Sequence, residues 1–324
     1  MSMTVLITGG AGYVGAVLAQ LLLRDCCHVR VLDSLRSGGA ALPGLYPQEG
    51  FAFLHGDIRD GALLRRALAG VDAVVHLAAI VGDPACKRLP DEARSVNHTA
   101  SLRLYEASRA AGVTRFVFAS TCSNYGRMRD PEQLVNEEAE LRPLSLYAET
   151  KVAVERALLT ASSGPAATVL RFATLYGVSP RMRFDLTVNQ FTMELLTRGE
   201  LDVYGAQFWR PYLHVADAAR AARLALILPP GRVAGRVFNV GDSAENYTKS
   251  QLVELISGQI GGGRIRSVDA PDDPRDYRVS FERIRRELDF RITRTLADGV
   301  REIAELVRAG VFPDPHHPQH WNDR

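Results

Sequence analysis

Short apolar runs alternate with longer amphipathic stretches through the first half of the chain. The apolar runs are rich in β-branched residues and hydrophobic at consecutive positions, which is typical of parallel strands covered by helices on both faces. They predict strands at Thr4–Thr8, His28–Asp33, Phe51–His55, Ala73–Leu77, Arg115–Ser120 and Thr168–Arg171. Apolar residues spaced by three and four positions predict helices near Tyr13–Arg24, Gly61–Ala69, Asp91–Ala111 and Leu146–Thr160. This alternation predicts an α/β fold with a doubly wound parallel sheet.

The alternation becomes less regular after about Gly177, where Pro- and Gly-rich joints appear. Apolar spacing still predicts helices near Leu186–Arg198, Val215–Leu228, Ser250–Ile260 and Leu296–Arg308. We therefore expect the second half to build a smaller lobe that binds a substrate.

The composition narrows the class of protein. The chain has 324 residues, 46% of them hydrophobic and 23% charged, which is ordinary for a globular protein and unlike a disordered chain. Its net charge of +2 gives no electrostatic reason to expect a nucleic acid or an anionic membrane as partner. No uninterrupted apolar run reaches membrane-spanning length. Four cysteines without metal-ligand spacing predict neither a disulfide framework nor a metal site, and they favour the cytoplasm.

A glycine-rich turn follows the first predicted strand and opens a helix. Its sequence is T-G-G-A-G-Y-V-G, from Thr8 to Gly15. Glycines there let the chain turn tightly and bring backbone N–H groups close to a pyrophosphate at the helix N-terminus. With a strand before it and a helix after it, the turn favours a dinucleotide site over a flexible loop. The contacts expected from it are Gly9, Gly12, Tyr13, Val14 and Gly15.

Residues at later strand ends extend the predicted dinucleotide site. Asp33 ends the second strand, where its carboxylate can accept hydrogen bonds from an adenosine ribose and would repel a 2′-phosphate, so NAD is favoured over NADP. Arg36 is the counter-argument, because an arginine there could hold that phosphate. The other contacts expected at strand ends are Asp57, Ile58, Leu77, Ala78 and Ala79.

Tyr147 and Lys151 stand four positions apart on a predicted helix, which puts both side chains on one face about one turn apart. Lys151 is one of only three lysines among the 39 basic residues. A nearby ammonium stabilises a phenolate and lowers the pKa of a tyrosine. Tyr147 could then accept a proton from an alcohol at neutral pH. Thr121, just past the fifth strand, is expected at the same sheet edge, where its hydroxyl can bind the reacting oxygen.

Ordered motifs along nearly the whole chain carry a family resemblance. After the glycine turn come G-D-I-R-D from Gly56, H-L-A-A from His76, S-T-C-S-N-Y-G from Ser120, Y-A-E-T-K from Tyr147, R-F-A-T-L-Y-G from Arg171, W-R-P-Y-L-H-V-A-D from Trp209 and F-N-V-G from Phe238. With these motifs the chain resembles extended short-chain dehydrogenase/reductases of the NAD-dependent epimerase/dehydratase family, whose usual substrates are nucleotide sugars. The resemblance implies a Rossmann-type domain carrying NAD over residues 1–175, with a return segment at about 212–242, and a nucleotide-sugar lobe over most of 176–324.

The resemblance also implies roles for individual residues. Thr121, Tyr147 and Lys151 match the family's catalytic triad, and Asn97 matches the helix residue that supports the lysine through water. The shared chemistry oxidises the sugar C4 hydroxyl, with the hydride going to NAD and the proton to the tyrosine.

The residues after Thr121 bear on what happens to the oxidised sugar. The family's dehydratases carry Asp and Glu there and its decarboxylases a Glu, whereas this chain has Cys122 and Ser123. Because 4-epimerisation needs no further base, we expect a nucleotide-sugar 4-epimerase. Two alternatives stay open within the family: epimerisation at C3 or C5 with the Cys122 thiol moving the proton, and dehydratase or ketoreductase chemistry. The alternative of a different class is a non-catalytic NAD-sensing protein, although such proteins typically lose the tyrosine or the lysine.

Arginines are expected to hold the substrate diphosphate, because their planar forks suit bidentate contacts. Arg210 in W-R-P-Y matches the family's diphosphate arginine, and Thr174 stands where many members have an asparagine. Tyr277 lies near the position that limits the sugar C2 substituent in related epimerases. The expected substrate contacts are Thr121, Ser123, Thr174, Arg181, Arg183, Asn189, Arg210, Arg275 and Tyr277. The resemblance further implies a homodimer formed through the helices near Asp91–Ala111 and Leu146–Thr160.

Overall fold

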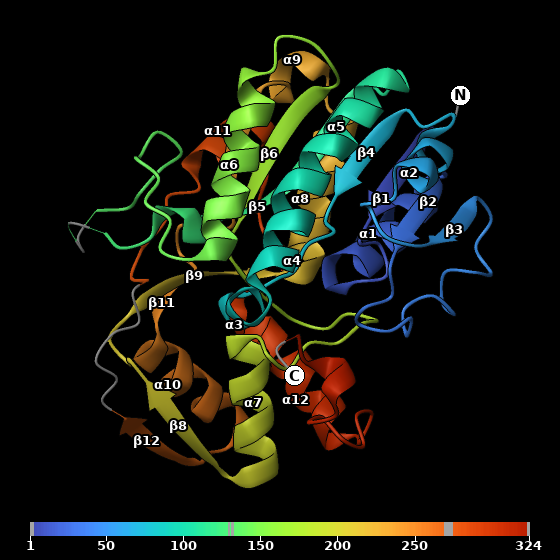
Figure 1. Cartoon of the computed structure of the whole chain (residues 1–324). Coiled ribbons are helices and arrows are strands. Elements are labelled where there is room, and N and C mark those ends of the chain that lie inside the picture. The colour runs from blue at the N-terminus through green and yellow to red at the C-terminus, as the bar shows by residue number, and fades with distance from the viewer. Residues whose placement is uncertain (1–2, 129, 131–132, 269–274, 323–324) are drawn as a thin grey trace.

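A seven-stranded parallel sheet runs through the larger part of the molecule (Figure 1). The computed structural model describes residues 3–128, 130, 133–268 and 275–322. The strand order is β10-β6-β5-β4-β1-β2-β3. These strands are β1 (Thr4–Thr8), β2 (His28–Asp33), β3 (Phe51–His55), β4 (Ala73–His76), β5 (Arg115–Thr121), β6 (Ala166–Phe172) and β10 (Arg236–Val240). The predicted fold class is confirmed, and six of these strands lie within two residues of their predicted ends.

Helices cover both faces of this sheet. On one face lie α2 (Gly61–Leu68), α5 (Ser101–Ala110) and α6 (Leu146–Thr160), and on the other lie α1 (Tyr13–Arg24) and α8 (Val215–Ile227) (Figure 1). Consecutive residues of a strand pack into the cores on opposite faces of the sheet, because side chains alternate along a strand. Val5 and Ile7 belong to the core under α1 and α8, whereas Leu6 belongs to the other core.

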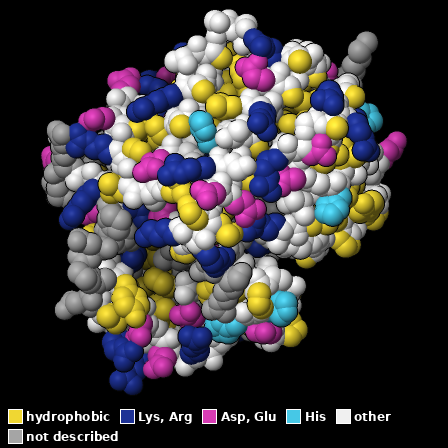
Figure 2. All heavy atoms as spheres, in the orientation of Figure 1, with side chains coloured by type: hydrophobic (Ala, Val, Ile, Leu, Met, Phe, Trp, Pro, Cys, Tyr) yellow, Lys and Arg dark blue, Asp and Glu magenta, His cyan; other side chains and the backbone are white. Residues whose placement is uncertain are grey.

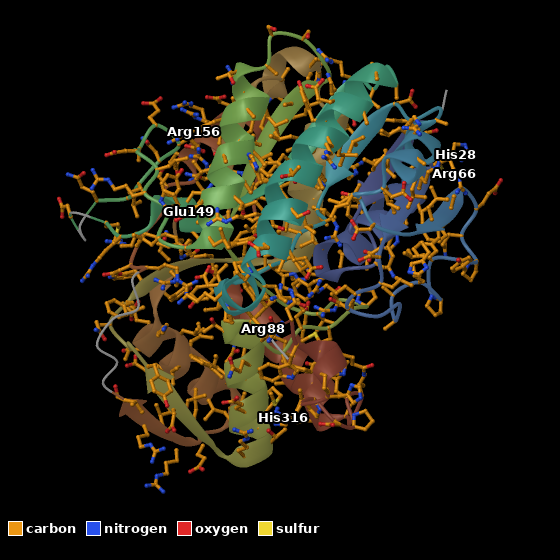
Figure 3. All side chains as sticks on the ribbon, viewed as in Figure 1. His28, Arg66, Arg88, Glu149, Arg156 and His316 are labelled. Carbon is orange, nitrogen blue, oxygen red and sulfur yellow. The ribbon has the colours of Figure 1, made fainter. Side chains whose placement is uncertain are left out.

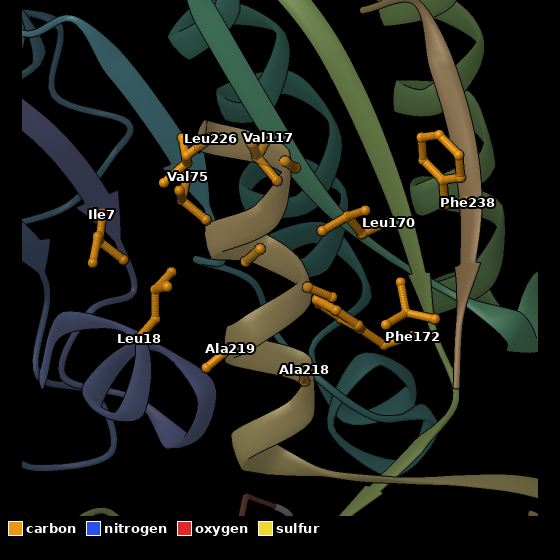
Figure 4. Packing of buried hydrophobic residues seen from close by; sticks show 14 of the residues in the cluster. Ile7, Leu18, Val75, Val117, Leu170, Phe172, Ala218, Ala219, Leu226 and Phe238 are labelled. Atoms are coloured by element: carbon orange, nitrogen blue, oxygen red, sulfur yellow. The ribbon is translucent and has the colours of Figure 1, made fainter. Parts of the chain in front are cut away.

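Small residues let α8 pack closely on its face of the sheet. Ala218 and Ala219 are fully buried there, and Figure 4 shows them near Leu18 of α1 and the apolar side chains of the sheet strands. Alanines lose no side-chain entropy in a helix and leave room for the larger strand residues. Residues 215–240 come from the second half of the chain but pack in the sheet domain, where they form α8 and β10.

The helix predicted over Asp91–Ala111 is divided in the structure. It comprises α4 (Pro90–Arg94), a π-helical stretch η1 (Ser95–Ala100) and α5. A π-turn holds one more residue than an α-turn and is often found at functional sites. Within η1 the Asn97 side chain turns to the Ile80 backbone, accepting from its N–H at 2.7 Å and donating to its C=O at 2.9 Å. Apolar periodicity does not record such an insertion, so the prediction of one continuous helix was wrong.

The remaining elements build a smaller lobe around its own core, which includes Tyr176, Phe184, Leu252 and Val300. Its sheets are β11-β9-β7, and β12 paired with β8. The strands are β7 (Thr174–Tyr176), β8 (Glu200–Tyr204), β9 (Trp209–His214), β11 (Asn246–Thr248) and β12 (Arg264–Val268). The main helices are α7 (Thr187–Arg198), α10 (Lys249–Ile260) and α12 (Leu296–Arg308). Shorter elements of the chain are α3 (Asp83–Arg88), α9 (Pro230–Val233), α11 (Glu282–Leu288), η2 (Cys122–Tyr125) and η3 (Pro318–His320).

The surface carries both signs of charge. On the face shown in Figure 2, basic and acidic side chains are interspersed and do not gather into one basic field. A nucleic-acid partner would favour a continuous basic patch. Among the described residues, every helix is too short or too polar to cross a membrane.

A buried ion pair ties α6 to the sheet. Arg171 of β6 donates to both Glu155 carboxylate oxygens of α6, with the shortest N–O distance at 2.7 Å. Ser120, at the end of β5, donates to the same carboxylate, and so does Asn124 at 2.8 Å. Arg171 and Glu155 are at most 5% exposed, so each charge depends on the other for compensation.

We expect Glu155→Gln to lower the free energy of unfolding by about 3 kcal/mol, because the Arg171 charge would stay buried without a carboxylate. The matched control is Glu149→Gln, at an exposed glutamate of the same helix, where a change of no more than about 0.5 kcal/mol is expected. Urea unfolding of both variants measures the difference. Equal, small losses in the two variants would contradict the importance given to the pair.

Candidate active site

A cavity of about 520 Å³ opens at the carboxyl ends of β1, β2, β4 and β5. Most residues expected at a site from the sequence line it together. These are Gly9, Gly12, Tyr13, Val14, Gly15, Asp33, Asp57, Ile58, Leu77, Ala78, Ala79, Thr121, Ser123, Tyr147, Lys151, Thr174, Arg181, Arg183 and Arg275. Parallel strands end at one edge of a sheet, which brings these distant segments into one space.

The glycine turn between β1 and α1 has no room for side chains. Gly9 has a φ of +75°, and a Cβ on it would meet the Ala78 nitrogen at 2.7 Å. A Cβ on Gly15 would collide with the Gly9 carbonyl oxygen. Gly12 precedes the first turn of α1, which no side chain of the described residues caps. The backbone N–H groups of that turn are therefore available at the cavity. They form an anion-binding site that suits a pyrophosphate.

Asp33 sits beside this turn at the end of β2. Its carboxylate oxygens accept from the Ala11 N–H at 3.0 Å and the Leu35 N–H at 2.8 Å, which fixes its orientation while leaving further lone pairs for a ligand. Burial raises the pKa of Asp33, and these two backbone hydrogen bonds oppose the rise. Arg36 pairs with Glu92 at 2.7 Å. That pairing weakens the argument that Arg36 binds a 2′-phosphate, and it is consistent with the preference for NAD expected from Asp33.

Thr121, Tyr147 and Lys151 face the cavity from β5 and α6. Ser145 begins α6 by accepting from the Ala148 N–H, and Tyr147 and Lys151 follow on the face toward β5. Lys151 is buried, and its Nζ donates to the Ala119 C=O at 2.9 Å. The same Nζ lies 5.8 Å from the centre of the Tyr147 ring. Thr121 accepts from the Ser123 N–H at 3.1 Å, so its hydroxyl hydrogen is free to reach toward the cavity.

The electrostatics of this pair differ from the expectation. Burial raises the pKa of Tyr147 above its usual value, and the positive charge that opposes the rise belongs to Arg183. Burial also lowers the pKa of Lys151 from its usual 10.5 to about 8. Burial therefore outweighs the nearby positive charge at Tyr147, contrary to the prediction that Lys151 lowers this pKa.

Two residues expected near the chemistry lie outside the cavity lining. Cys122 is fully buried; its thiol donates to the Arg171 C=O at 3.2 Å, and burial raises its pKa well above the usual value. It therefore cannot present a thiolate to a sugar in this arrangement. The side-chain amide of Asn97 is hydrogen-bonded to the Ile80 backbone. The backbone C=O of Asn97 accepts from the Ser101 hydroxyl at 2.8 Å.

Three expected substrate contacts are also displaced from the lining. Asn189 is fully buried in α7 and holds the Gly177 N–H at 2.9 Å and the Arg183 C=O at 2.8 Å. Arg210 donates to the Trp209 and Arg275 carbonyls and lies over the Tyr277 ring. The Tyr277 hydroxyl lies 3.2 Å from the Ser123 hydroxyl. These side chains support residues that line the cavity instead of lining it themselves.

Several polar residues of the lining were not predicted from the sequence, among them Asp83, Asp185 and Asn322. Asp83 begins α3 and pairs with Arg275 at 3.0 Å, and Asp185 pairs with Arg183 at 2.5 Å. Asn322, near the C-terminal end of the described chain, also lines the cavity. Asp185 lies two positions after Arg183 and was within reach of sequence reasoning, but no pattern signals Asn322. Among the described residues there is no cluster of three or more side chains suited to a metal ion.

The family model of the NAD dependent epimerase/dehydratase family matches residues 5–241. The chain belongs to this family. It is 33% identical over 300 residues to a UDP-glucose 4-epimerase of Streptomyces lividans, covering 86% of this chain and 87% of the relative. It is equally 33% identical over 324 residues to a dTDP-glucose 4,6-dehydratase of Streptomyces niveus, covering 94% and 93%. The crystal structure of the Thermus thermophilus UDP-glucose 4-epimerase complex with NAD matches with a TM-score of 0.81 at 27% identity, covering 94% of this chain and 99% of that one.

The cofactor of this family member is NAD, and its described residues fit that molecule. The close approach of Gly9 to Ala78 and the uncapped first turn of α1 leave space for a pyrophosphate. Asp33 stands where its remaining lone pairs would accept hydrogen bonds from the hydroxyls of a ribose diol.

The buried lysine predicts a pH dependence of stability. Because the folded pKa of Lys151 is about 8 and its usual value is 10.5, the folded state releases this proton first as pH rises. Stability from this group is therefore lowest below about pH 8 and rises toward about pH 10.5. Unfolding free energies measured between these pH values should increase by up to about 3 kcal/mol more for the wild type than for Lys151→Met. Lys87→Met, at the exposed lysine of α3, is the control. A constant difference between wild type and Lys151→Met would contradict the assignment.

Proposed function

We propose that this protein is a nucleotide-sugar 4-epimerase. Asp33 and the glycine turn after β1 would hold NAD, which would supply a hydride acceptor and donor for the sugar C4. Tyr147 takes the C4 hydroxyl proton and gives it back, acting as general base and then general acid. Thr121 binds the reacting oxygen, and Lys151 holds the cofactor ribose and supports the phenolate when the site is filled.

The charges around Tyr147 suit a reversible proton transfer. Burial favours the neutral phenol, so the proton returns readily to the sugar oxygen. The positive charge of Arg183, which lines the cavity, favours the phenolate during the oxidation step. The opposing influences let one residue serve in both half-reactions.

The pairing of the cavity carboxylates supports epimerisation over dehydration as the reaction of this protein. Elimination of water requires a free carboxylic acid and carboxylate beside the sugar. Five carboxylates line the cavity among the described residues: Asp33, Asp57, Asp83, Glu92 and Asp185. The last four each pair with an arginine at 2.5 to 3.0 Å, and Asp33 accepts backbone N–H groups at the cofactor end. Ser123 cannot replace an acid, and the buried Cys122 argues against proton exchange at C3 or C5.

Arg275 is the arginine best placed for the substrate diphosphate. It lines the cavity, and its C=O accepts from Arg210, which thereby positions it. Its guanidinium pairs with Asp83 at 3.0 Å. We propose that Arg275 keeps this carboxylate and binds the diphosphate through its remaining N–H groups, with Ser123 and Thr174 completing the contacts. This assigns the sugar nucleotide to the smaller lobe and NAD to the sheet.

A homodimer remains part of the proposal. Figure 3 shows Glu149 and Arg156 on the outer side of α6, where a second copy could contact them. Light scattering of the purified protein measures the oligomeric state.

The decisive experiment combines product analysis with a variant of the proposed base. We expect the wild type, given UDP-, dTDP-, GDP-, ADP- and CDP-hexoses, to convert at least one of them to its C4 epimer, as seen by proton NMR. Tyr147→Phe should lose about 10²- to 10⁴-fold in rate because the proton has no acceptor, while retaining bound NAD. Tyr46→Phe, at an exposed tyrosine, is the control.

Three outcomes would contradict the proposal. A 4-keto-6-deoxy sugar product would indicate a dehydratase. Net accumulation of a ketone with NADH would indicate a dehydrogenase. NAD binding without turnover of any hexose would favour a non-catalytic NAD-sensing protein.

A further inference from the structure

The segment before α7 lies against the first turn of α1. Tyr13 opens α1, and its hydroxyl donates to the Gly177 C=O at 2.6 Å. The Ser179 hydroxyl donates to the Tyr13 C=O at 2.7 Å and accepts from the Arg181 N–H at 3.3 Å. Two hydrogen bonds thus connect Arg181 to the helix end that faces the cofactor pyrophosphate.

The Arg181 guanidinium is buried and only partly satisfied. The residue is 3% exposed and lines the cavity. Its Nη2 donates to the Asn322 side-chain oxygen at 2.7 Å, but its Nε has no hydrogen-bond partner among the described residues. The neighbouring carboxylate, Asp185, is engaged by Arg183. Burial and the charge of Arg183 lower the pKa of Arg181 to about 10, as expected for a cation that lacks an anion.

Residues 309–322, here called the C-terminal tail, bring Asn322 to this arginine. Phe312 and His320 of the tail pack edge-to-face on Phe184, with ring centres 5.2 and 5.8 Å away. The Phe184 N–H donates to the His320 C=O at 2.8 Å. Trp321 is buried, and its indole N–H donates to the Pro315 C=O at 3.0 Å. The tail is therefore packed in place and ends over the cavity.

We propose that Arg181 binds the pyrophosphate of NAD and that the C-terminal tail, through Asn322, positions it there. This changes the expectation that Arg181 contacts the substrate diphosphate. Arg181 is a binding residue, and Asn322 is a positioning residue that acts through it. The inference rests on the NAD dependence of the family and not on the fate of the sugar.

The location of Arg181 favours the cofactor over the substrate. Its charge acts to lower the pKa of Asp33, which lies at the adenosine end of the cavity. The arginine proposed for the substrate, Arg275, pairs instead with Asp83 of α3. A charge-assisted hydrogen bond from a buried guanidinium to a phosphate is strong because little water competes with it. Such a contact would hold NAD between the two half-reactions of an epimerase.

The test measures cofactor binding directly. Arg181→Met removes the charge and keeps most of the side-chain volume, and we expect it to weaken NAD binding about 10- to 100-fold. Asn322→Ala should weaken NAD binding about 3- to 10-fold by freeing the guanidinium. The NAD dissociation constant is measured by calorimetry on protein stripped of NAD, and bound NAD in purified protein by chromatography. Arg198→Met, at an exposed arginine of α7, is the matched control.

Binding of UDP and dTDP, measured by thermal shift, separates the two diphosphate sites. We expect Arg181→Met and Asn322→Ala to leave UDP and dTDP binding unchanged. Unchanged NAD affinity in Arg181→Met would overturn the proposal, and so would loss of UDP or dTDP binding with NAD retained. Deletion of residues 311–324 should release NAD as Arg181→Met does; if that variant does not fold, Asn322→Ala decides the role of the tail. None of these measurements depends on sugar turnover. Failure of the epimerase proposal can therefore be distinguished from failure of the proposal that Arg181 binds NAD.

Discussion

The buried ion pair between Glu155 and Arg171 is the constraint on which the site depends. Glu155 is one turn beyond Lys151, and Lys151 is one turn beyond Tyr147, so all three lie along one face of α6. The pair fixes this face against β6, while Ser120 and Asn124 bind the same carboxylate from the end of β5. Thr121 follows Ser120 directly. The ion pair therefore connects the two elements that carry Thr121 and Tyr147, although it lies beneath the cavity.

The Rossmann-type half of the molecule could be predicted because its patterns are local. Strands buried on both faces read as continuous apolar runs, and a glycine turn between a strand and a helix has a single common use. The cofactor-side residues of the cavity, from Gly9 to Ala79, were predicted from such signals. The spacing of Tyr147 and Lys151 was informative for the same reason, since a helix converts four positions into one turn.

What could not be predicted depends on contacts between distant segments. The π-helical stretch contains Asn97, whose side chain binds the Ile80 backbone, a contact that apolar periodicity does not indicate. Cys122 follows Thr121 in the sequence, but the 3₁₀ turn after β5 directs its thiol to the Arg171 C=O and away from the cavity. The pKa of Tyr147 could not be inferred from the nearby lysine, because burial is a property of the whole fold. Asn322 reaches the cavity only through the packing of the tail on Phe184.

The arginines in and beneath the cavity differ in their hydrogen-bond partners, which the sequence did not predict. Arg183 and Arg275 are held by carboxylates, Arg181 by an amide, and Arg171 by a carboxylate beneath the site. The carboxylate partners compensate the charges of the other three arginines, whereas the proposed partner of the Arg181 charge is the pyrophosphate of NAD. The single lysine of the lining, Lys151, is compact enough to sit between Tyr147 and the end of β5.

The most direct test of the proposed chemistry follows the hydrogen on C4. A UDP- or dTDP-hexose deuterated at C4 would be converted by the wild-type protein and its product examined by NMR and mass spectrometry. Epimerisation through a transient ketone predicts that the deuterium returns to C4 of the inverted sugar, with no loss to water. Deuterium at C6 of a keto-deoxy product, or an inverted sugar whose C4 deuterium has been lost to solvent, would contradict it.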